Sequence, residues 1–248
     1  MRESRTIMGM QVVLTIPGEV ATPADFEAVF AHFVAVDDRF SPFKPDSEIS
    51  RINRGEIATQ DYSAQMTEIF ALSEKTKLES AGFFNICRPD GLIDPCGIVK
   101  GWAIHKAACL LRERDIENFC VEAGGDVQCH GVNAAGEEWR VGIRSPFNSG
   151  KLIKMLHPKG CGVATSGSYI QGPHIYDPLT GRNVDSDIVS LTVVGPDVME
   201  ADRYATAAFA MGRGGIAFIA NLDGFEGYEV DRTGISRMTS GLVRHLPC

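Results

Sequence analysis

The chain has 248 residues and a net charge of −8 at pH 7, with 44% hydrophobic and 23% charged residues. Such a composition is ordinary for a globular protein of one large or two small domains. The negative charge argues against a nucleic-acid-binding protein, and an anionic ligand would need a metal ion, a lysine or a helix N-terminus nearby. No apolar run approaches the length of a membrane span.

The N-terminal stretch MRESRTIMGM and the cysteines indicate a cellular compartment. The stretch is polar and lacks the apolar core of a signal peptide, so we expect a cytoplasmic protein. The seven cysteines are odd in number and form no Cys-x-x-Cys pair. We therefore expect most of them to be reduced packing residues.

The first half of the chain predicts one strand followed by helices. Alternating apolar residues predict a strand over residues 9–16. Thr22 and Pro23 are suited to the N-cap and first position of a helix, and an apolar stripe from Phe26 to Val34 follows them. Further helices are expected near residues 46–55, 63–81 and 98–114.

The second half predicts short strands with two intervening helices. We expect strands at 119–122 and 127–131, joined by a turn at Gly124 and Gly125, because glycine allows positive φ. Further strands are expected at 139–143, 161–164, 190–195, 227–230 and 234–238, and helices at 201–211 and 216–222. Residues 165–169 read as a small-residue loop. The pattern predicts an α+β fold in a single domain over 1–248, built as one compact unit of one or two lobes.

One octet, ADRYATAA at 201–208, has the composition of a metal-binding helix. Asp202 and Thr206 are four residues apart and therefore share one helix face. A carboxylate and a hydroxyl one turn apart offer oxygen ligands to a hard cation such as Mg²⁺. The alternative is that Asp202 caps the helix and Thr206 is an ordinary helical threonine.

Four polar, glycine-rich segments stand out against the apolar strands. They are residues 94–101, 123–126, 165–181 and 201–206. Each lies where a strand or loop meets a turn, which is the usual place for functional groups. Together they supply carboxylates, hydroxyls, backbone amides, a lysine and a histidine. This inventory suits a phosphate ligand held partly through a metal ion.

An ordered set of motifs extends this interpretation. The motifs are MGMQVVLTI, SPFKPDSEISRIN, GFFN, DPCGIVKGWAIHKA, VEAGGDV, WRVGI, VATSGSY, HIYDPLTG, SLTVVG and ADRYATAAFAMG. In this order the chain resembles the ApbE-type flavin transferases (FAD:protein FMN transferases) from Met8 to about Gly212. The resemblance implies an α+β fold, with a mixed sheet and packed helices, that binds FAD and Mg²⁺. It also implies transfer of FMN from FAD to a Thr or Ser hydroxyl of an acceptor flavoprotein, with release of AMP.

The resemblance also implies roles for individual residues. The metal ligands would be Asp202, Thr206 and the backbone carbonyl of Gly97, and the ion would be Mg²⁺ or Mn²⁺. His174 would join Asp202 as a catalytic residue by handling a proton, or would be a structural histidine. The flavin and phosphate contacts would be Met8, Phe43, Phe84, Asn85, Asp94, Lys100, His174 and Ile175. Asp126 would either support this site or cap the turn that precedes it.

The chain departs from the family pattern around the GFFN motif. Asn85 stands where Asp is usual, and only about eight residues separate it from Asp94, fewer than is common. Pro95 and Cys96 replace Leu and Gly. We therefore expect part of the pocket or its lid to be altered there.

Three functions remain open from the sequence alone. The first is the FMN transferase, which would act on a separate acceptor protein because no stretch of this chain clearly repeats an acceptor motif. The second is a hydrolase that makes FMN and AMP from FAD with water as nucleophile. The third is an FAD-binding protein without catalysis, against which the paired Asp202 and Thr206 argue.

Overall fold

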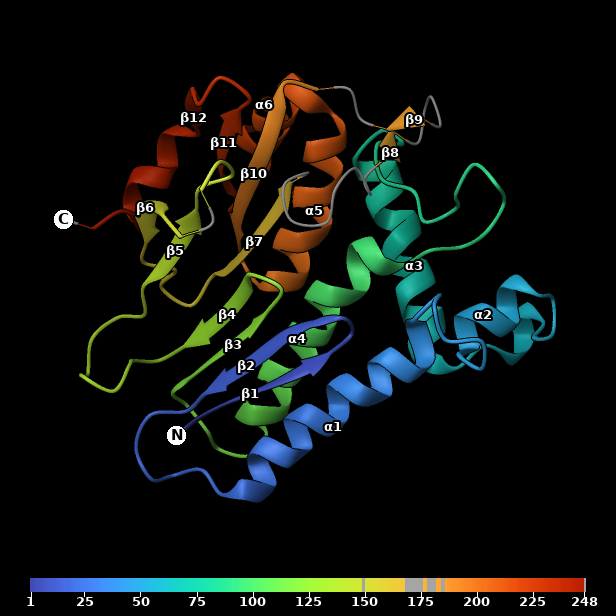
Figure 1. Cartoon of the computed structure of the whole chain (residues 1–248), viewed down its shortest axis with the longest axis horizontal. Helices are drawn as coiled ribbons and strands as arrows, with labels where there is room; N and C mark the ends of the chain where they lie inside the picture. Colours follow the sequence, from blue (N-terminus) through green and yellow to red (C-terminus); the bar gives the residue numbers. More distant parts are fainter. Residues whose placement is uncertain (149, 168–175, 178–181, 184–185, 248) are drawn as a thin grey trace.

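The central feature of the fold is an eight-stranded sheet (Figure 1). The structure is a computed structural model and describes residues 1–148, 150–167, 176–177, 182–183 and 186–247. The strand order is β1-β2-β3-β4-β7-β10-β11-β12, and every neighbouring pair is antiparallel. These strands are β1 (Arg2–Ile7), β2 (Met10–Thr15), β3 (Phe119–Ala123), β4 (Asp126–His130), β7 (Gly162–Gly167), β10 (Ile188–Gly195), β11 (Glu226–Asp231) and β12 (Ser236–Met238).

The remaining strands form two separate ribbons. One joins β5 (Val141–Arg144) to β6 (Leu152–Leu156), and the other joins β8 (Tyr176–Asp177) to β9 (Arg182–Asn183). Apolar residues of the first ribbon, Ile143 and Leu156, form a cluster with Val163 of β7 and Val194 of β10. The ribbon therefore covers part of the large sheet.

In the described part of the chain, six α-helices accompany the sheet. They are α1 (Pro23–Phe40), α2 (Glu48–Asn53), α3 (Ala64–Glu79), α4 (Cys96–Arg112), α5 (Val198–Ala210) and α6 (Gly215–Ala220), with short 3₁₀ turns at Thr59–Asp61, Gly212–Gly214 and Ser240–His245. Helix α4 packs on β3 and β4, and α5 packs on β7 and β10. The predicted α+β class is confirmed, with an antiparallel rather than a mixed main sheet. Within the described part of the chain, no helix is both long and apolar enough to cross a bilayer.

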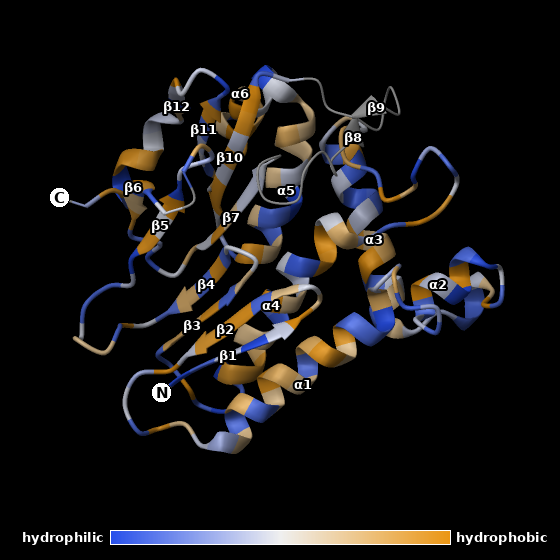
Figure 2. Cartoon of the chain, viewed as in Figure 1, coloured by the Kyte–Doolittle hydropathy of each residue, from blue (hydrophilic) through white to orange (hydrophobic). Residues whose placement is uncertain are grey.

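The largest core lies between the first strands and helices α1 and α4. Val12 and Leu14 lie on one face of β2 because side chains alternate along a strand, and Ile16 directly follows the strand; all three are fully buried. They join a cluster that contains Phe30 of α1 and Trp102 of α4. Figure 2 shows the apolar stripes of the strands and helices that make this contact possible. Burial of such side chains contributes about 1.5–3 kcal/mol each.

Side-chain caps fix where two helices begin. Thr22 precedes α1, and its backbone N–H donates to the carboxylate of Asp25 at 2.8 Å, while Pro23 takes the first helical position. Asp197 precedes α5 and accepts from the backbone N–H of Glu200 at 3.0 Å. Asp202 therefore lies in the second turn of α5, and its interpretation as the helix cap is wrong.

β8 and β9 were not predicted, and three strands of the large sheet and the β5–β6 ribbon also differ from the sequence prediction. β1 was not expected, because its side chains are mostly exposed and carry no apolar alternation. β6 was also not expected, and most of its side chains are likewise only partly covered. Residues 165–167 were expected to be a loop, but they continue β7 and pair with residues 190–192 of β10. Here only β10 pairs with β7, because β4 pairs with β7 only at residues 162 and 163.

A buried arginine joins α5 to α3. Arg203 is 1% exposed, and its guanidinium donates to Glu79 at 2.6 Å and to Thr76 at 3.1 Å. The hydroxyl of Tyr204 donates to the same Glu79 carboxylate at 2.8 Å. These charge-assisted bonds fix the rotation of α5, which in turn sets the direction of Asp202 and Thr206 on the same helix.

Candidate functional site

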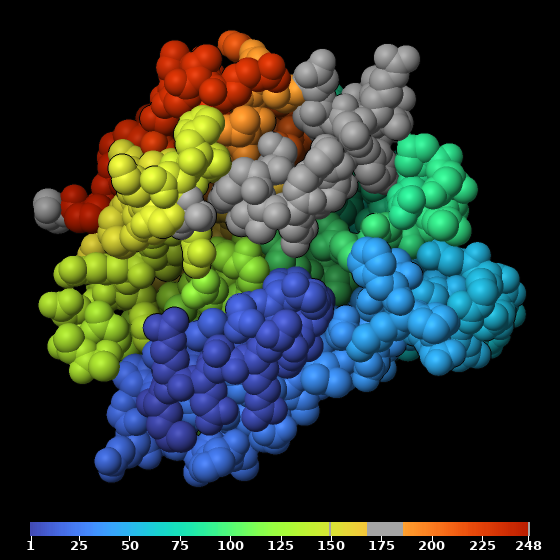
Figure 3. Space-filling view, in the orientation of Figure 1, coloured from blue at the N-terminus to red at the C-terminus, as the bar shows by residue number. Residues whose placement is uncertain are grey.

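A cavity of about 730 Å³ opens beside the end of the sheet where β2, β3 and β7 meet helices α1, α4 and α5. This volume is within the range of ligand pockets, about 300–1,000 Å³. Its walls come from distant parts of the chain: the β1–β2 turn, the C-terminal end of α1, residues 83–86, the first turns of α4, the β3–β4 turn, β7 and α5. Figure 3 shows the first two strands and the residues around α2 on one face of the molecule.

Helices α4 and α5 approach each other closely at the floor of this cavity. The backbone N–H of Gly101 donates to Oδ2 of Asp202 at 2.7 Å. A Cβ atom on Gly101 would lie 2.5 Å from the Cβ of Asp202, so only glycine fits without displacement. Asp202 is 2% exposed and is held in place by α4 as well as by its own helix.

A lysine lies between two buried carboxylates. Nζ of Lys100 is 3.1 Å from Oδ1 of Asp202 and also contacts Oδ2 of Asp126. The other oxygen of Asp126 accepts from the backbone N–H of Thr165 at 2.9 Å. Asp126 is 0% exposed, and it therefore supports the site by positioning the lysine rather than by only capping a turn. When both carboxylates are ionised, the ammonium and the two carboxylates leave one excess negative charge.

Burial and charge set the proton affinity of this cluster. Burial raises the pKa of Asp126 to about 7; the ammonium of Lys100 opposes this rise, and the charge of Asp202 adds to it. Burial alone would lower the pKa of Lys100, but the two carboxylates outweigh it and raise that pKa above its ordinary value. Lys100 is therefore a fixed positive charge at neutral pH.

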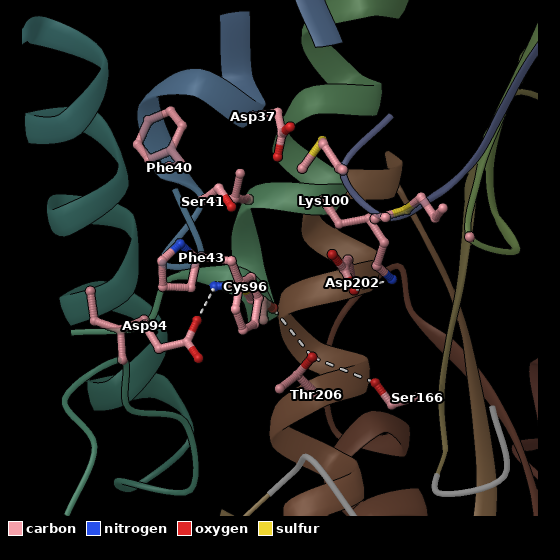
Figure 4. A pocket seen from close by; sticks show the side chains of 18 of the residues that line it. Asp37, Phe40, Ser41, Phe43, Asp94, Cys96, Lys100, Ser166, Asp202 and Thr206 are labelled. Carbon is pink, nitrogen blue, oxygen red and sulfur yellow. Dashed lines mark hydrogen bonds and ion pairs between the residues drawn. The ribbon is translucent and has the colours of Figure 1, made fainter. Parts of the chain in front are cut away.

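Oxygen atoms of α4, α5 and β7 converge one turn further along α5. The hydroxyl of Thr206 donates to the backbone carbonyl of Gly97 at 3.3 Å, and Oγ of Ser166 lies 3.5 Å from the same hydroxyl (Figure 4). Asp202 and Thr206 both line the cavity, as expected for residues four apart on one helix. Among the described residues, no group of three or more His, Cys, Asp or Glu side chains is arranged to hold a metal.

Aromatic side chains also line the cavity. Phe43 is 86% exposed, whereas Phe40 and Phe84 are only 2% and 4% exposed. Such an exposed ring at the mouth of a pocket is a surface on which a planar ligand can stack. The described geometry thus combines a charged floor with an apolar rim.

The short segment between Asn85 and Asp94 forms a compact turn. Cys87 and Ile93 make an isolated antiparallel bridge, and the side chain of Asn53 both donates to the carbonyl of Ile93 and accepts from its N–H, at 2.9 and 2.8 Å. Asn85 and Asp94 still line the cavity. The shortness of this segment therefore does not remove Asn85 or Asp94 from the cavity wall.

The structure gathers almost all of the residues that the sequence singled out. The predicted site residues that line the cavity are Met8, Phe43, Phe84, Asn85, Asp94, Gly97, Lys100, Asp202 and Thr206. His174 and Ile175 lie outside the described residues. Residues 37, 40–42 and 44, at and after the end of α1, also line the cavity but were not proposed as contacts, although the break in helical pattern at RFSPFK pointed to this segment.

The raised pKa of Asp126 predicts a pH dependence of stability. Asp126 has a pKa of about 7 in the folded protein and of about 4 in the unfolded chain. Its contribution to the free energy of unfolding therefore declines as the pH rises from about 4 to about 7. Without added divalent cation, the free energy of unfolding of the wild type relative to Asp126→Asn should therefore fall over that window. Denaturant unfolding at several pH values measures it.

Asp231 supplies a control with the opposite sign. The hydroxyl of Thr233 donates to Asp231 at 2.7 Å and lowers the pKa of this carboxyl. The stability of the wild type relative to Asp231→Asn should therefore rise with pH below about 4 and stay level from 4 to 7. A level curve for Asp126→Asn as well would contradict the prediction.

Comparison with known proteins places the chain in a family. The ApbE family model matches residues 8–89 and 87–228, so the chain belongs to the ApbE family. The FAD:protein FMN transferase of Vibrio cholerae is 35% identical over 133 residues, which cover 50% of this chain and 40% of that protein. The Escherichia coli K12 protein of the same name is 30% identical over 160 residues, which cover 61% of this chain and 46% of that protein.

The sequence matches thus span less than half of these relatives' own lengths, whereas the structural matches span whole chains. The flavin transferase ApbE from Vibrio cholerae matches with a TM-score of 0.86 at 23% identity, covering 99% of both chains. The ApbE protein of Thermotoga maritima matches with a TM-score of 0.87 at 20% identity, covering 100% of this chain and 99% of that one. These likenesses establish the fold.

Proposed function

We propose that the chain is a Mg²⁺-dependent FAD:protein FMN transferase, contained in a single domain over residues 1–248. It transfers FMN from FAD to a Thr or Ser hydroxyl of an acceptor flavoprotein and releases AMP. The observation that carries this proposal is the meeting of Gly97, Lys100, Asp202 and Thr206 at the floor of one cavity. The FAD:protein FMN transferases that match half of the chain support it.

The residues at the cavity floor fit a magnesium ion. Octahedral Mg²⁺ with ligands at about 2.1 Å places neighbouring ligands about 3 Å apart. The carbonyl oxygen of Gly97 and the hydroxyl of Thr206 are 3.3 Å apart, close to that spacing. The donors are all oxygen, and the Asp126–Lys100–Asp202 cluster has one excess negative charge to offset when both carboxylates are ionised. When bound, the ion supplies charge neutralisation and Lewis acidity at the pyrophosphate.

The other cavity residues hold the substrate. Phosphoryl transfer depends mainly on positioning and on neutralising charge. Lys100, fixed by Asp126, places a permanent positive charge at the phosphates, and the N-terminal end of α4 adds its dipole. Phe43 and Phe84 form apolar surfaces for the flavin or adenine ring, with Met8, Asn85, Asp94 and Ile175 as the other contacts.

The chemical step joins the acceptor to the FMN phosphate. The hydroxyl oxygen of the acceptor attacks the phosphorus on the riboflavin side of the pyrophosphate, and the bond from that phosphorus to the AMP oxygen breaks. AMP leaves as a phosphate monoester. In this proposal His174 takes the proton of the attacking hydroxyl.

The test follows both products of FAD. The protein is incubated with FAD and Mg²⁺, with and without a peptide that carries an acceptor threonine preceded by an acidic residue and glycine. Chromatography measures AMP and FMN, and mass spectrometry measures flavin on the peptide. We expect AMP in step with flavinylated peptide, no flavin on a Thr→Ala peptide, and loss of both products with a chelator. Mn²⁺ replaces Mg²⁺ in a parallel reaction.

Other outcomes would contradict the transferase. AMP with free FMN and an unmodified peptide would make the protein a hydrolase of FAD. FAD that stays bound and intact in every reaction would make it a flavin-binding protein. Turnover that persists in the presence of chelator would remove the metal from the proposal.

A further inference from the structure

Two cysteines face each other across the hairpin formed by β3 and β4. Cys120 and Cys129 are register partners, and their Sγ atoms are 3.1 Å apart. The mechanism proposed above uses neither of them. We propose that they form a modification site: a reversible cross-strand disulfide, made by exchange with a low-molecular-weight disulfide. This inference is independent of the proposed flavin transfer.

The hairpin places this pair at a favourable position. Its turn consists of Gly124 and Gly125, with φ values of 60° and 97°, and the strands are closed by the pair Ala123–Asp126. Hydrogen-bonded and non-hydrogen-bonded pairs alternate away from such a turn, so Cys120 and Cys129 fall on a non-hydrogen-bonded pair. Its Cα atoms are about 4.5 Å apart, within the range that a disulfide spans.

The pair lies on the face of the sheet away from α5. Gln128, the neighbour of Cys129, accepts from the backbone N–H of Val198 at the start of α5 at 2.9 Å. Because successive side chains point to opposite faces, Cys129 and its partner Cys120 point away from that helix. Cys120 is partly exposed there, whereas Cys129 is 2% exposed.

This difference in exposure determines which of the two cysteines reacts first. The thiolate of Cys120 attacks one sulfur of the small disulfide, forms a mixed disulfide and releases the first small thiol, which takes up the Cys120 proton. The contact with Cys120 and burial raise the pKa of Cys129, so its thiol is the second to react. It loses its proton, attacks the Cys120 sulfur and releases the second small thiol. One disulfide is reduced for each one formed.

The test maps the sulfur chemistry of the full chain. Reduced protein is incubated with oxidised glutathione, quenched with N-ethylmaleimide and digested for mass spectrometry. We expect a linked pair of peptides that contain Cys120 and Cys129, without retained glutathione, and its loss after treatment with dithiothreitol. The Cys129→Ser variant should keep glutathione on Cys120, and the Cys120→Ser variant should leave Cys129 free. Cys161→Ser, a control outside the pair, should form the link as the wild type does.

Two results would overturn the proposal. One is wild-type protein in which both cysteines remain free while the exposed Cys87 and Cys96 have reacted. The other is wild-type protein in which Cys120 retains glutathione beside an unreacted Cys129. Both are read from wild-type protein, so neither depends on a variant that folds.

Discussion

Replacing Asp202 with asparagine is expected to lower the rate of flavin transfer by roughly a thousandfold, which corresponds to about 4 kcal/mol of transition-state stabilisation. The change keeps the shape of the side chain, and its amide oxygen can still accept from the N–H of Gly101. It removes one negative charge from the proposed metal site and leaves Lys100 with Asp126 as its remaining carboxylate partner there. Steady-state rates over a range of Mg²⁺ concentrations measure both the loss and the weaker dependence on the ion.

Two other variants locate this effect in the site. Thr206→Val, which has nearly the same shape, should also weaken the response to Mg²⁺, because it removes a proposed oxygen ligand. Asp187→Asn removes a carboxylate that pairs with Arg213 and does not line the cavity, and it should retain the wild-type rate. An Asp202→Asn protein that folds and works at the wild-type rate would exclude the proposed metal site.

Adding one methyl group at Gly101 is expected to have the largest effect on stability. In Gly101→Ala the new Cβ would lie 2.5 Å from the Cβ of Asp202 and 2.8 Å from the carbonyl oxygen of Val198. Because the second contact is backbone, α4 and α5 must separate. We expect the free energy of unfolding to fall by about 3 kcal/mol, which lowers Tm by roughly 6–12 °C in a chain of this size.

A second glycine controls for the substitution itself. At Gly214 a new Cβ would meet nothing closer than the Cβ of Met211 at 3.9 Å, and the φ value is an ordinary −79°. Gly214→Ala should therefore change Tm by at most a degree or two. If the two variants melted at the same temperature, the close approach of α4 and α5 would not be essential to stability.

The parts of the fold that the sequence predicted are those with a buried face. The apolar stripe after Pro23 predicted α1, and the glycine pair at Gly124 predicted the β3–β4 hairpin; the structure confirms both. The edge strand β1 has no such face, so hydrophobic alternation could not reveal it. Likewise, residues 165–167 belong to a strand because they pair with β10, a distant contact that their run of small residues did not reveal.

The candidate site also contains residues that the sequence could predict and one that it could not. The spacing of Asp202 and Thr206 is local and predicted their shared helix face, and ordered motifs pointed to Asp94 and Gly97, which lie in the same cavity. The role of Asp126 depends on a contact with Lys100, which is 26 residues away in the chain. The sequence alone therefore left two alternatives for Asp126, and the fold had to decide between them.

The order of strands in the sheet has a consequence for how the chain folds during synthesis. β2 pairs with β3 between Val12 and Ala123, and about 110 residues of chain separate these partners. At a synthesis rate of about 5–20 residues per second, the edge of β2 that pairs with β3 therefore stays unpaired for roughly 5–20 s. During that interval β1 covers only the outer edge, and its side chains, Arg2 and Arg5 among them, are mostly exposed. The N-terminal hairpin thus keeps one unpaired edge while about 110 further residues are made, and α1, which packs on β1, is the first helix that can contact it.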